Sequence, residues 1–383
     1  MDFDVVIIGF GLVGSSIAYH LNKSSSQKIA IIEQAFDYIP TKSSIGGSRI
    51  GGRSIGSECR EYYEMLPFSN NEYRELAKYN PKIHKPNNGI VVGQDSQLLK
   101  DIISSSIENN VEVDIIEGKQ QKIIDPYFRQ FQSLEKAIIE KNNSQNMLGI
   151  LNPSEIIKTY YNLLKDDVEF FWDHKFIEYK RNEESIELST INSNAKKTIR
   201  AKKLIYATNA NSDILQQYNL TLSRQRIPVF YYEVKNSNLN NTYIEVVNNH
   251  FEMYAMPEVI EGKYYIKTGL HNCHLYDDMG LTDQEFADKI SRILTEKIKK
   301  NFPGLNSDFN PMLSMCEYGL TKDGLPLVGK IDDDIWVAVG FNGHGCKHAP
   351  AFGKMVSDSV LNIEDRKLYN VFDPLRFHSS IKS

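Results

Sequence analysis

The chain has 383 residues, 41% of them hydrophobic, so it can bury a large core and form two domains. Its 44 basic and 49 acidic residues give a formal net charge of −5, which argues against an extended nucleic-acid-binding face or a polybasic membrane patch. No apolar run approaches the length of a membrane span and residues 1–9 do not resemble a signal peptide, so we expect a cytoplasmic protein.

The N-terminal segment "DVVIIGFGLVGSSIAYHLN" predicts a buried strand, a glycine turn and a helix. The turn reads G-x-G-x-x-G, with Gly9 for the sharp turn, Gly11 for close approach of a pyrophosphate and Gly14 for tight packing of helix on strand. The positive end of the helix dipole would face the phosphates. A glycine turn that binds no ligand is the alternative interpretation.

A second strand, "KIAIIEQ", ends in Glu33, at the spacing expected of a carboxylate that holds ribose hydroxyls. The combined pattern favours an adenine dinucleotide without a 2′-phosphate, because the acidic side chain would repel one. FAD and NAD both stay open at this point.

Later segments predict two kinds of sheet. Residues 202–215 and 334–345 are apolar strands that run into small-residue turns, as in a doubly wound sheet. Residues 243–270 alternate and are rich in Tyr, Val and Ile, which is typical of antiparallel strands. A helix is predicted over 282–300, with a Thr282–Glu285 capping box; its buried stripe would be Phe286, Ile290, Ile293, Leu294 and Ile298.

Two short segments that contain histidine and cysteine, "GFNGHGCKHAP" (340–350) and "HNCH" (271–274), raise the possibility of a zinc site. Such a site would need His344, Cys346, His271 and Cys273 to converge. Their spacings match no common zinc motif, and the glycines around His344 suit a loop against a bound ring better than a rigid ligand. We therefore expect no metal site.

The segments "MCEYGLTKDGLPLVG" (315–329) and "WVAVGFNGHGCK" (336–347) carry a family resemblance. They resemble the D-amino-acid-oxidase superfamily, and within it the monomeric sarcosine oxidase / N-methyltryptophan oxidase group, over nearly the whole chain. The resemblance implies FAD and an α/β fold, in which a Rossmann-like doubly wound FAD-binding domain is interleaved with a substrate domain built on an antiparallel or mixed sheet plus helices. The FAD-binding domain would comprise residues 1–85, 147–225 and 316–383, and the substrate domain residues 86–146 and 226–315.

The resemblance also assigns cofactor contacts. A cysteine in a C-x-Y stretch carries FAD through a thioether in that group, and Cys316 occupies this position. A small buried hydrophobic residue is the alternative for Cys316. Gly343, His344 and Gly345 would lie against the flavin, and Arg49 would lie beside its ring.

Substrate contacts follow from the same resemblance. Lys347 and Arg53 would bind the substrate carboxylate, since a cationic pair orients a carboxylate well. Tyr254, Tyr318 and His271 would line the pocket on the amine side.

The motif "YYIKTGLHN" (264–272) places Lys267 four residues before His271, as in the family. The resemblance implies that the Lys267 ammonium promotes the reaction of reduced flavin with dioxygen, because a fixed cation stabilises superoxide. A solvated lysine at a strand end is the alternative.

Several positions depart from the family pattern. One extra residue precedes Arg53, Ile45 replaces a pocket histidine, Asn209 replaces a glycine and Cys346 replaces an aromatic residue. These changes imply a pocket with a shape of its own, so the substrate need not be sarcosine.

The predicted function is FAD-dependent oxidation of the C–N bond of an amino acid, secondary, N-methyl or cyclic, to an imine, with dioxygen reduced to hydrogen peroxide. The alternative is a dehydrogenase of the same fold that passes electrons to a quinone or a partner protein. A flavoprotein acting on transfer RNA is disfavoured by the acidic charge balance, and a non-catalytic binding protein by the retained site residues. We expect neither nucleic-acid nor membrane partners; the oligomeric state stays open, with a monomer favoured.

Overall fold

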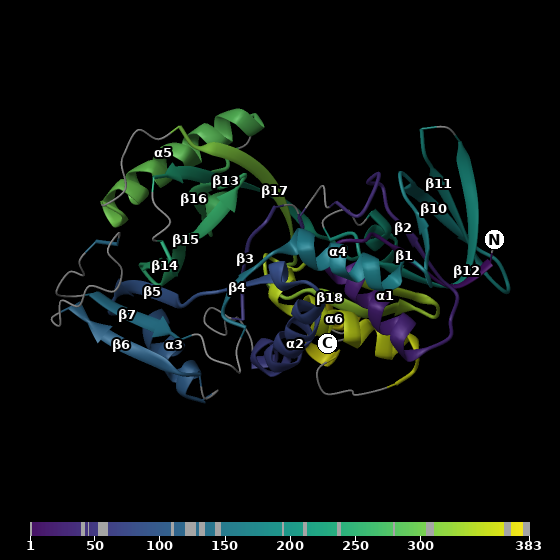
Figure 1. Ribbon diagram of the computed structural model, residues 1–383. Helices are drawn as coiled ribbons and strands as arrows, with labels where there is room; N and C mark the ends of the chain where they lie inside the picture. The colour runs from purple at the N-terminus through teal and green to yellow at the C-terminus, as the bar shows by residue number, and fades with distance from the viewer. Residues whose placement is uncertain are drawn as a thin grey trace.

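The structure is a computed structural model. It describes residues 2–39, 43–44, 46–52, 60–108, 111–118, 128–129, 135–141, 147–193, 195–209, 213–235, 239–278, 280–303, 310–363 and 369–377. The elements form two lobes side by side, each built on its own large sheet (Figure 1).

The first sheet is the predicted doubly wound sheet. Its central strands pair in parallel, and β18 joins its edge through β19. The order β10-β11-β12-β1-β2-β9 places the first strand in the middle, where both faces are covered and an uninterrupted apolar run is required. Its strands are β1 (Asp2–Ile8), β2 (Ile29–Ile32), β9 (Glu169–Phe171), β10 (Lys175–Arg181), β11 (Ile186–Ile191), β12 (Lys196–Tyr206), β18 (Leu327–Asp332) and β19 (Ile335–Val339).

Helices from distant parts of the chain cover one face of this sheet. They are α1 (Leu12–Ser24), α2 (Arg60–Tyr79), α4 (Pro153–Leu164), α6 (Gly345–Val360) and the short α7 (Tyr369–Phe372). Helices α1 and α6 approach closely at Gly353, which has no side chain. A Cβ atom there would lie only 2.1 Å from the Ser16 hydroxyl. The start and the end of the chain are thereby packed into one core.

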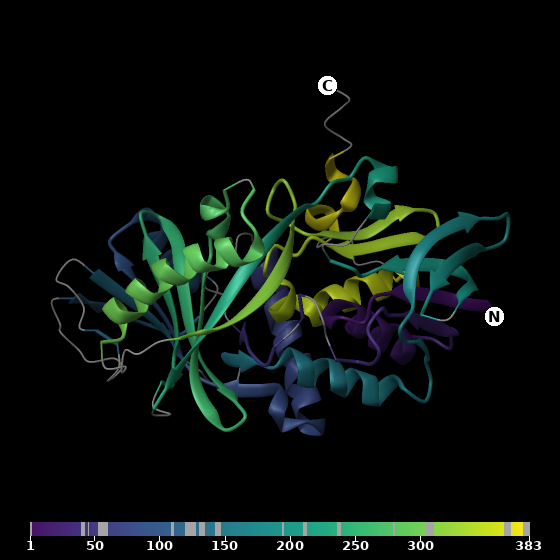
Figure 2. The same cartoon turned by 90° about the horizontal axis from the view of Figure 1, so that it is seen from above.

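The second sheet is mixed, with the order β17-β13-β16-β15-β14-β5-β7-β6. Helix α5 (Asp283–Asn301) lies across one face (Figure 2) and α3 (Gln97–Glu108) packs against the other. In β5, Ile90 and Val92 face α5 and Val91 faces α3. Both faces of the strand are therefore buried, which explains why its side chains are apolar on both sides. Its strands are β5 (Gly89–Gln94), β6 (Val113–Glu117), β7 (Glu135–Glu140), β13 (Ser223–Val234), β14 (Thr242–Val247), β15 (His250–Ile260), β16 (Lys263–Leu270) and β17 (Met312–Leu320).

Helix α5 agrees with its sequence prediction. The Thr282 hydroxyl accepts the backbone N–H of Glu285, whose carboxylate accepts the backbone N–H of Thr282. Its buried residues include Phe286, Ile290, Leu294 and Ile298, whereas Ile293 is half-buried.

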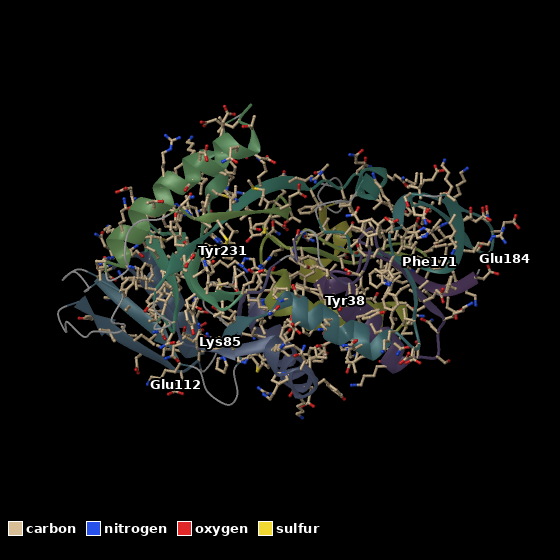
Figure 3. All side chains as sticks on the ribbon, turned by 45° about the horizontal axis from the view of Figure 1, so that its top comes forward. Tyr38, Lys85, Glu112, Phe171, Glu184 and Tyr231 are labelled. Carbon is tan, nitrogen blue, oxygen red and sulfur yellow. The ribbon has the colours of Figure 1, made fainter. Side chains whose placement is uncertain are left out.

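A small third sheet, in the order β3-β8-β4, consists of β3 (Arg49–Gly51), β8 (Gly149–Leu151) and β4 (His84–Pro86). Short 3₁₀ helices η1 (Pro81–Ile83), η3 (Asp213–Tyr218), η4 (Cys273–Tyr276) and η5 (Pro374–Phe377) complete the described elements. Among the labelled side chains, Tyr231 lies in the lobe of the second sheet and Phe171 in that of the first (Figure 3).

The architecture confirms the predicted fold class. The predicted domain boundaries cut through β13 and β17, which belong to the second sheet over their whole lengths, and those boundaries stay a prediction. Across the described residues, every helix is too short or too polar to cross a lipid bilayer.

Candidate active site

The glycine turn between β1 and α1 forms a cradle that leaves no room for side chains. Gly9 has φ +98°, and a Cβ atom there would lie 2.7 Å from the Ala207 carbonyl oxygen. A Cβ atom at Gly14 would lie 2.1 Å from the Gly9 carbonyl oxygen, so only glycine lets α1 pack on the turn. Gly11 precedes the first helical residue and faces the Ser44 hydroxyl, which accepts the Leu12 N–H at 3.4 Å. The backbone geometry therefore fits a bound pyrophosphate.

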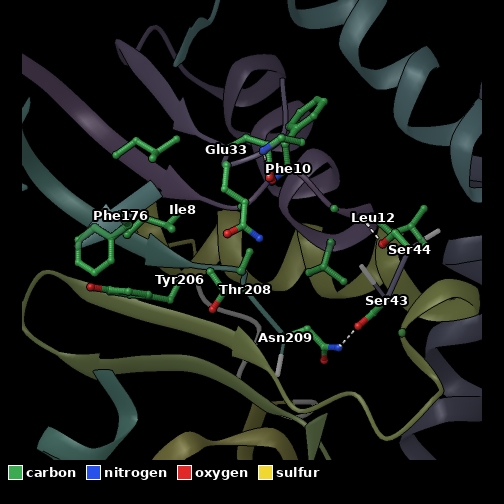
Figure 4. A pocket seen from close by; sticks show the side chains of 18 of the residues that line it. Ile8, Phe10, Leu12, Glu33, Ser43, Ser44, Phe176, Tyr206, Thr208 and Asn209 are labelled. Carbon is green, nitrogen blue, oxygen red and sulfur yellow. Dashed lines mark hydrogen bonds between the residues drawn. The ribbon is translucent and has the colours of Figure 1, made fainter. Parts of the chain in front are cut away.

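Glu33 follows β2 directly, at the edge of this cradle (Figure 4). One carboxylate oxygen accepts the Phe10 N–H at 2.8 Å and the other accepts the Ala35 N–H at 2.9 Å. Each oxygen keeps a further lone pair for a ribose hydroxyl. The structure thus places Glu33 beside the glycine turn, and its predicted contact with a ribose stays a prediction.

A cavity of about 650 Å³ runs from this cradle along the first sheet. Its volume lies within the usual range for cofactor sites. Its lining includes His174, Phe176 and Tyr206, none of which the sequence pointed to, together with Arg49, Tyr318 and Gly343. The glycine cradle, the carboxylate and the volume of this cavity together fit FAD.

Asn209 lies on the wall of this cavity with φ +51°, a left-handed conformation that Asn tolerates better than most residues. Its side-chain amide donates a hydrogen bond to the Ser43 hydroxyl at 2.7 Å (Figure 4). Glycine adopts this conformation without strain, and the hydrogen bond fixes the segment that carries Ser43 and Ser44.

A second, smaller cavity of about 150 Å³ adjoins the first, and Arg49, Tyr318, Gly343 and Cys346 line both. Apolar residues of the second sheet that line it are Ile227, Val229, Ile244, Phe251, Met253 and Met256. Polar residues that line it include Lys267, His271, Lys347 and Tyr254. The structure thus brings the candidate residues of five distant segments around one space.

Lys267 is buried, with only 3% of its surface exposed, so the interpretation as a solvated strand-end lysine is wrong. Its ammonium donates to the Ser48 carbonyl oxygen at 2.6 Å and to the Ser48 hydroxyl at 3.1 Å, and lies 5.6 Å from the centre of the Tyr231 ring. Burial, together with the neighbouring Arg49, lowers the pKa of Lys267 to about 7. A lysine of this kind gains or loses its charge near neutral pH.

Arg49 lies on β3 and faces both cavities. Its guanidinium donates to the Ser48 carbonyl oxygen at 2.8 Å and to the Ser43 carbonyl oxygen at 3.0 Å. These two bonds hold a cationic side chain at the junction of the cavities.

The tyrosines of the smaller cavity stay neutral. Burial raises the pKa of Tyr318 to about 12 and that of Tyr254 well above its usual value. The two phenols can therefore donate hydrogen bonds but cannot act as bases near neutral pH. His271 lies just after β16, with its ring 5.7 Å from that of Phe251, and is an exposed residue.

Cys316 lies on β17 and lines the smaller cavity, with 7% of its surface exposed. Cys346 lies in the first turn of α6, where burial raises its pKa to about 12, so its thiol is inert near neutral pH. Cys273, Cys316 and Cys346 are free thiols in the described part of the chain.

The segment that leads into α6 approaches the junction of the cavities. Gly343 has φ +86°, and a Cβ atom there would lie 2.9 Å from the Tyr318 ring. His344 precedes the helix and lies 5.4 Å from the Tyr62 ring, Gly345 begins the helix, and Lys347 lines the smaller cavity. No group of three or more His, Cys, Asp or Glu side chains among the described residues is arranged to hold a metal ion.

Arg53 and Ile45 lie outside the described residues, so the predicted second arginine of the carboxylate site stays a prediction. Sequence reasoning also missed two polar residues beside the site, Ser48 and Glu258. Ser48 sits within the glycine-rich segment over the cavities, but nothing in the pattern "YAMPEVI" singles out Glu258.

Comparison with known proteins agrees with this geometry. A family model described as FAD dependent oxidoreductase (DAO) matches residues 4–359. The chain belongs to this family. It is therefore an FAD-dependent oxidoreductase.

Curated relatives of this oxidoreductase carry sarcosine oxidase names. A "Probable sarcosine oxidase" from Arabidopsis thaliana is 25% identical, with 94% of this chain and 89% of that protein covered. A "Monomeric sarcosine oxidase" from Bacillus sp. (strain B-0618) is also 25% identical, with 94% and 92% covered. In sequence, the oxidoreductase is sarcosine-oxidase-like.

Solved structures share its fold. An L-proline dehydrogenase from P. horikoshii aligns with a TM-score of 0.78 at 20% identity, covering 98% of both chains. A glycine oxidase from Geobacillus kaustophilus aligns with a TM-score of 0.75 at 16% identity, covering 98% of this chain and 99% of that one.

Proposed function

We propose that this FAD-dependent oxidoreductase oxidises the C–N bond of a secondary, N-methyl or cyclic amino acid to an imine and reduces dioxygen to hydrogen peroxide. The observation that carries the proposal is the small cavity, which adjoins the larger one and is lined by both cationic and apolar side chains. The sarcosine oxidase names of the relatives point to the same substrate class.

The cationic side chains that line this cavity suit the carboxylate of an amino-acid substrate. Lys347 would bind it from the start of α6, with Arg53 as the proposed second cation. A charged hydrogen bond of this kind is strong in a cavity that excludes water. Clamping the carboxylate would fix the position of the carbon beside the amine nitrogen.

The apolar side chains that line the cavity suit the hydrocarbon part of the substrate. Side chains such as Ile227, Val229 and Met253 offer no partner for a second charge, so a methyl group or a carbon ring fits better than a second carboxylate. Neutral Tyr254 and Tyr318 would shelter the amine with their ring faces.

Bound FAD would supply the hydride acceptor. The chain itself provides binding, orientation and charge, and the scheme requires no side chain as a general base provided that the amine binds deprotonated. The resulting imine is released or hydrolysed by water.

We further propose that Cys316 carries the flavin through a thioether and that Lys267 supplies the positive charge for the reaction with dioxygen. Both side chains line the smaller cavity, and Lys267 is held by Ser48 beside Arg49. A fixed cation in a dry site stabilises the superoxide formed in the first electron transfer.

The test is an anaerobic screen of N-methyl, cyclic, primary and dicarboxylic amino acids, with loss of the flavin absorbance as the readout. Sarcosine, proline and pipecolate represent the proposed class, and iminodiacetate is the dicarboxylic control. Admitting air should restore the absorbance and yield one hydrogen peroxide per substrate oxidised.

The outcomes separate the alternatives. Bleaching by a secondary amino acid with slow recovery in air, but fast recovery with a quinone, would replace the oxidase with a dehydrogenase. No bleaching by any amino acid would refute the proposed substrate class.

A further inference from the structure

Ser48 joins three charged side chains behind the smaller cavity. Its carbonyl oxygen accepts the Lys267 ammonium at 2.6 Å and the Arg49 guanidinium at 2.8 Å. Its hydroxyl accepts a second bond from Lys267 at 3.1 Å and donates to the Glu258 carboxylate. Since Ser48 is fully buried, this junction lies inside the protein.

The strand register brings Glu258 to this junction. Met256 of β15 pairs with Lys267 of β16, and Glu258 lies two residues further along β15 on the same face. Such diagonal cross-strand neighbours are within reach of long side chains. The carboxylate packs on the turn before Ser48, because a Cβ atom at Gly47 would lie 3.1 Å from Glu258 Oε1.

The arrangement answers an electrostatic problem. Two buried cations that share one carbonyl oxygen repel each other and lose hydration, which favours loss of a proton from the lysine. Arginine does not lose its proton in proteins, so the repulsion lowers the pKa of Lys267 instead. Glu258, one hydroxyl away, opposes this by stabilising the ammonium.

The groups that face Lys267 come from every neighbouring element. They are Arg49 from β3, Tyr231 from β13, Glu258 from β15, Cys316 from β17 and Cys346 from α6. The other titratable groups that line the same cavity are Tyr254, His271, Tyr318, His344 and Lys347. Of the described groups named here, Glu258 alone carries a carboxylate.

We propose that Glu258, acting through the Ser48 hydroxyl, is a positioning residue that keeps the Lys267 ammonium charged and directed at the smaller cavity. The inference rests on the proposed role of Lys267 beside the cofactor. The Lys267 pKa of about 7 reflects burial and Arg49, which lower it, and Glu258, which raises it. Without the carboxylate, Lys267 would lose its proton at a lower pH.

The test is a pH titration of the flavin absorbance in the oxidised holoenzyme, without substrate and without turnover. The wild-type protein should show a transition near pH 7 that is absent from Lys267→Met. In Glu258→Gln the transition should move down by about 1–3 pH units, the range for loss of an opposite charge at close distance. Glu258→Asp should restore it to near the wild-type position, and Ser48→Ala should move it in the same direction as Glu258→Gln.

Glu261→Gln is the matched control, since it removes the same charge from the exposed turn between β15 and β16. It should leave the transition in place. A Glu258→Gln titration that coincides with wild type would overturn the proposal, as would wild-type and Lys267→Met curves that do not differ. Because no amino acid or dioxygen enters this measurement, it stays decisive even if the proposed oxidase activity fails.

Discussion

Lys267 shows how a single side chain acquires a chemical property from its surroundings. At the exposed end of a strand it would keep an ordinary pKa near 10.4. In this protein β16 carries it into a buried position beside Arg49, and its pKa falls to about 7. Its charge therefore changes as the pH passes through about 7.

The first prediction concerns this charge. In stopped-flow experiments, the reaction of the reduced holoenzyme with dioxygen should slow as the pH rises through about 7, because the ammonium that stabilises superoxide is deprotonated. Lys267→Met should give a low rate that does not change across this range. Reduction by substrate should change much less, and a variant that slows both half-reactions equally would contradict the assigned role.

The second prediction concerns Lys347. Replacement by alanine should raise KM for carboxylate-bearing substrates by about 10- to 150-fold, because a charged hydrogen bond in a buried site contributes about 1.5–3 kcal/mol. Steady-state kinetics measure the effect. Lys322→Ala, which removes an exposed lysine from a turn, is the control and should leave KM unchanged. An unchanged KM in Lys347→Ala would mean that the carboxylate binds elsewhere.

At the scale of the elements, the β1–turn–α1 unit depends on glycine more than on any side chain. In Gly14→Ala the new Cβ atom would meet the Gly9 carbonyl oxygen, so α1 would have to move away from the cradle. Overpacking of this kind costs about 1–3 kcal/mol. We expect a lower thermal midpoint and a lower flavin content, measured by calorimetry and by absorbance. Ser24→Ala, at the exposed end of the same helix, should retain both.

The elements that sequence reasoning predicted have strong local signals. The first strand, the glycine turn and α1 follow from an apolar run and a helical period, and the start of α5 follows from a capping box at Thr282. The antiparallel strands over 243–270 follow from alternation. Each of these patterns lies within a few residues of chain.

Long-range pairing could not be predicted in the same way. The third sheet joins Arg49 on β3 to Leu151 on β8, and both strands have only three residues. The contact between Ser48 and Glu258 spans 210 positions of sequence. Such contacts depend on how distant elements pack. The residues of one short segment do not identify the segment with which it pairs.

At the scale of the whole molecule, the larger cavity is lined by residues from nearly the full length of the chain, from Ile8 to Cys346. Residues beside the first sheet supply the cradle, and Tyr318 on β17 comes from the second sheet. A ligand in this cavity contacts parts of the chain that separate on unfolding. Binding of FAD should therefore stabilise the entire fold rather than one loop.

The proposed tether at Cys316 makes this argument testable. With a thioether, the acid-precipitated wild-type protein should stay yellow and its thermal midpoint should not depend on added FAD. In Cys316→Ser the flavin becomes dissociable, so FAD at 100 times its Kd should stabilise the fold by about 2.7 kcal/mol, seen as a rise in midpoint with concentration. Cys273→Ser, which changes a buried thiol near α5, is the control and should keep the flavin bound. A colourless wild-type precipitate with free FAD in the supernatant would show that the cofactor is held by the cavity alone.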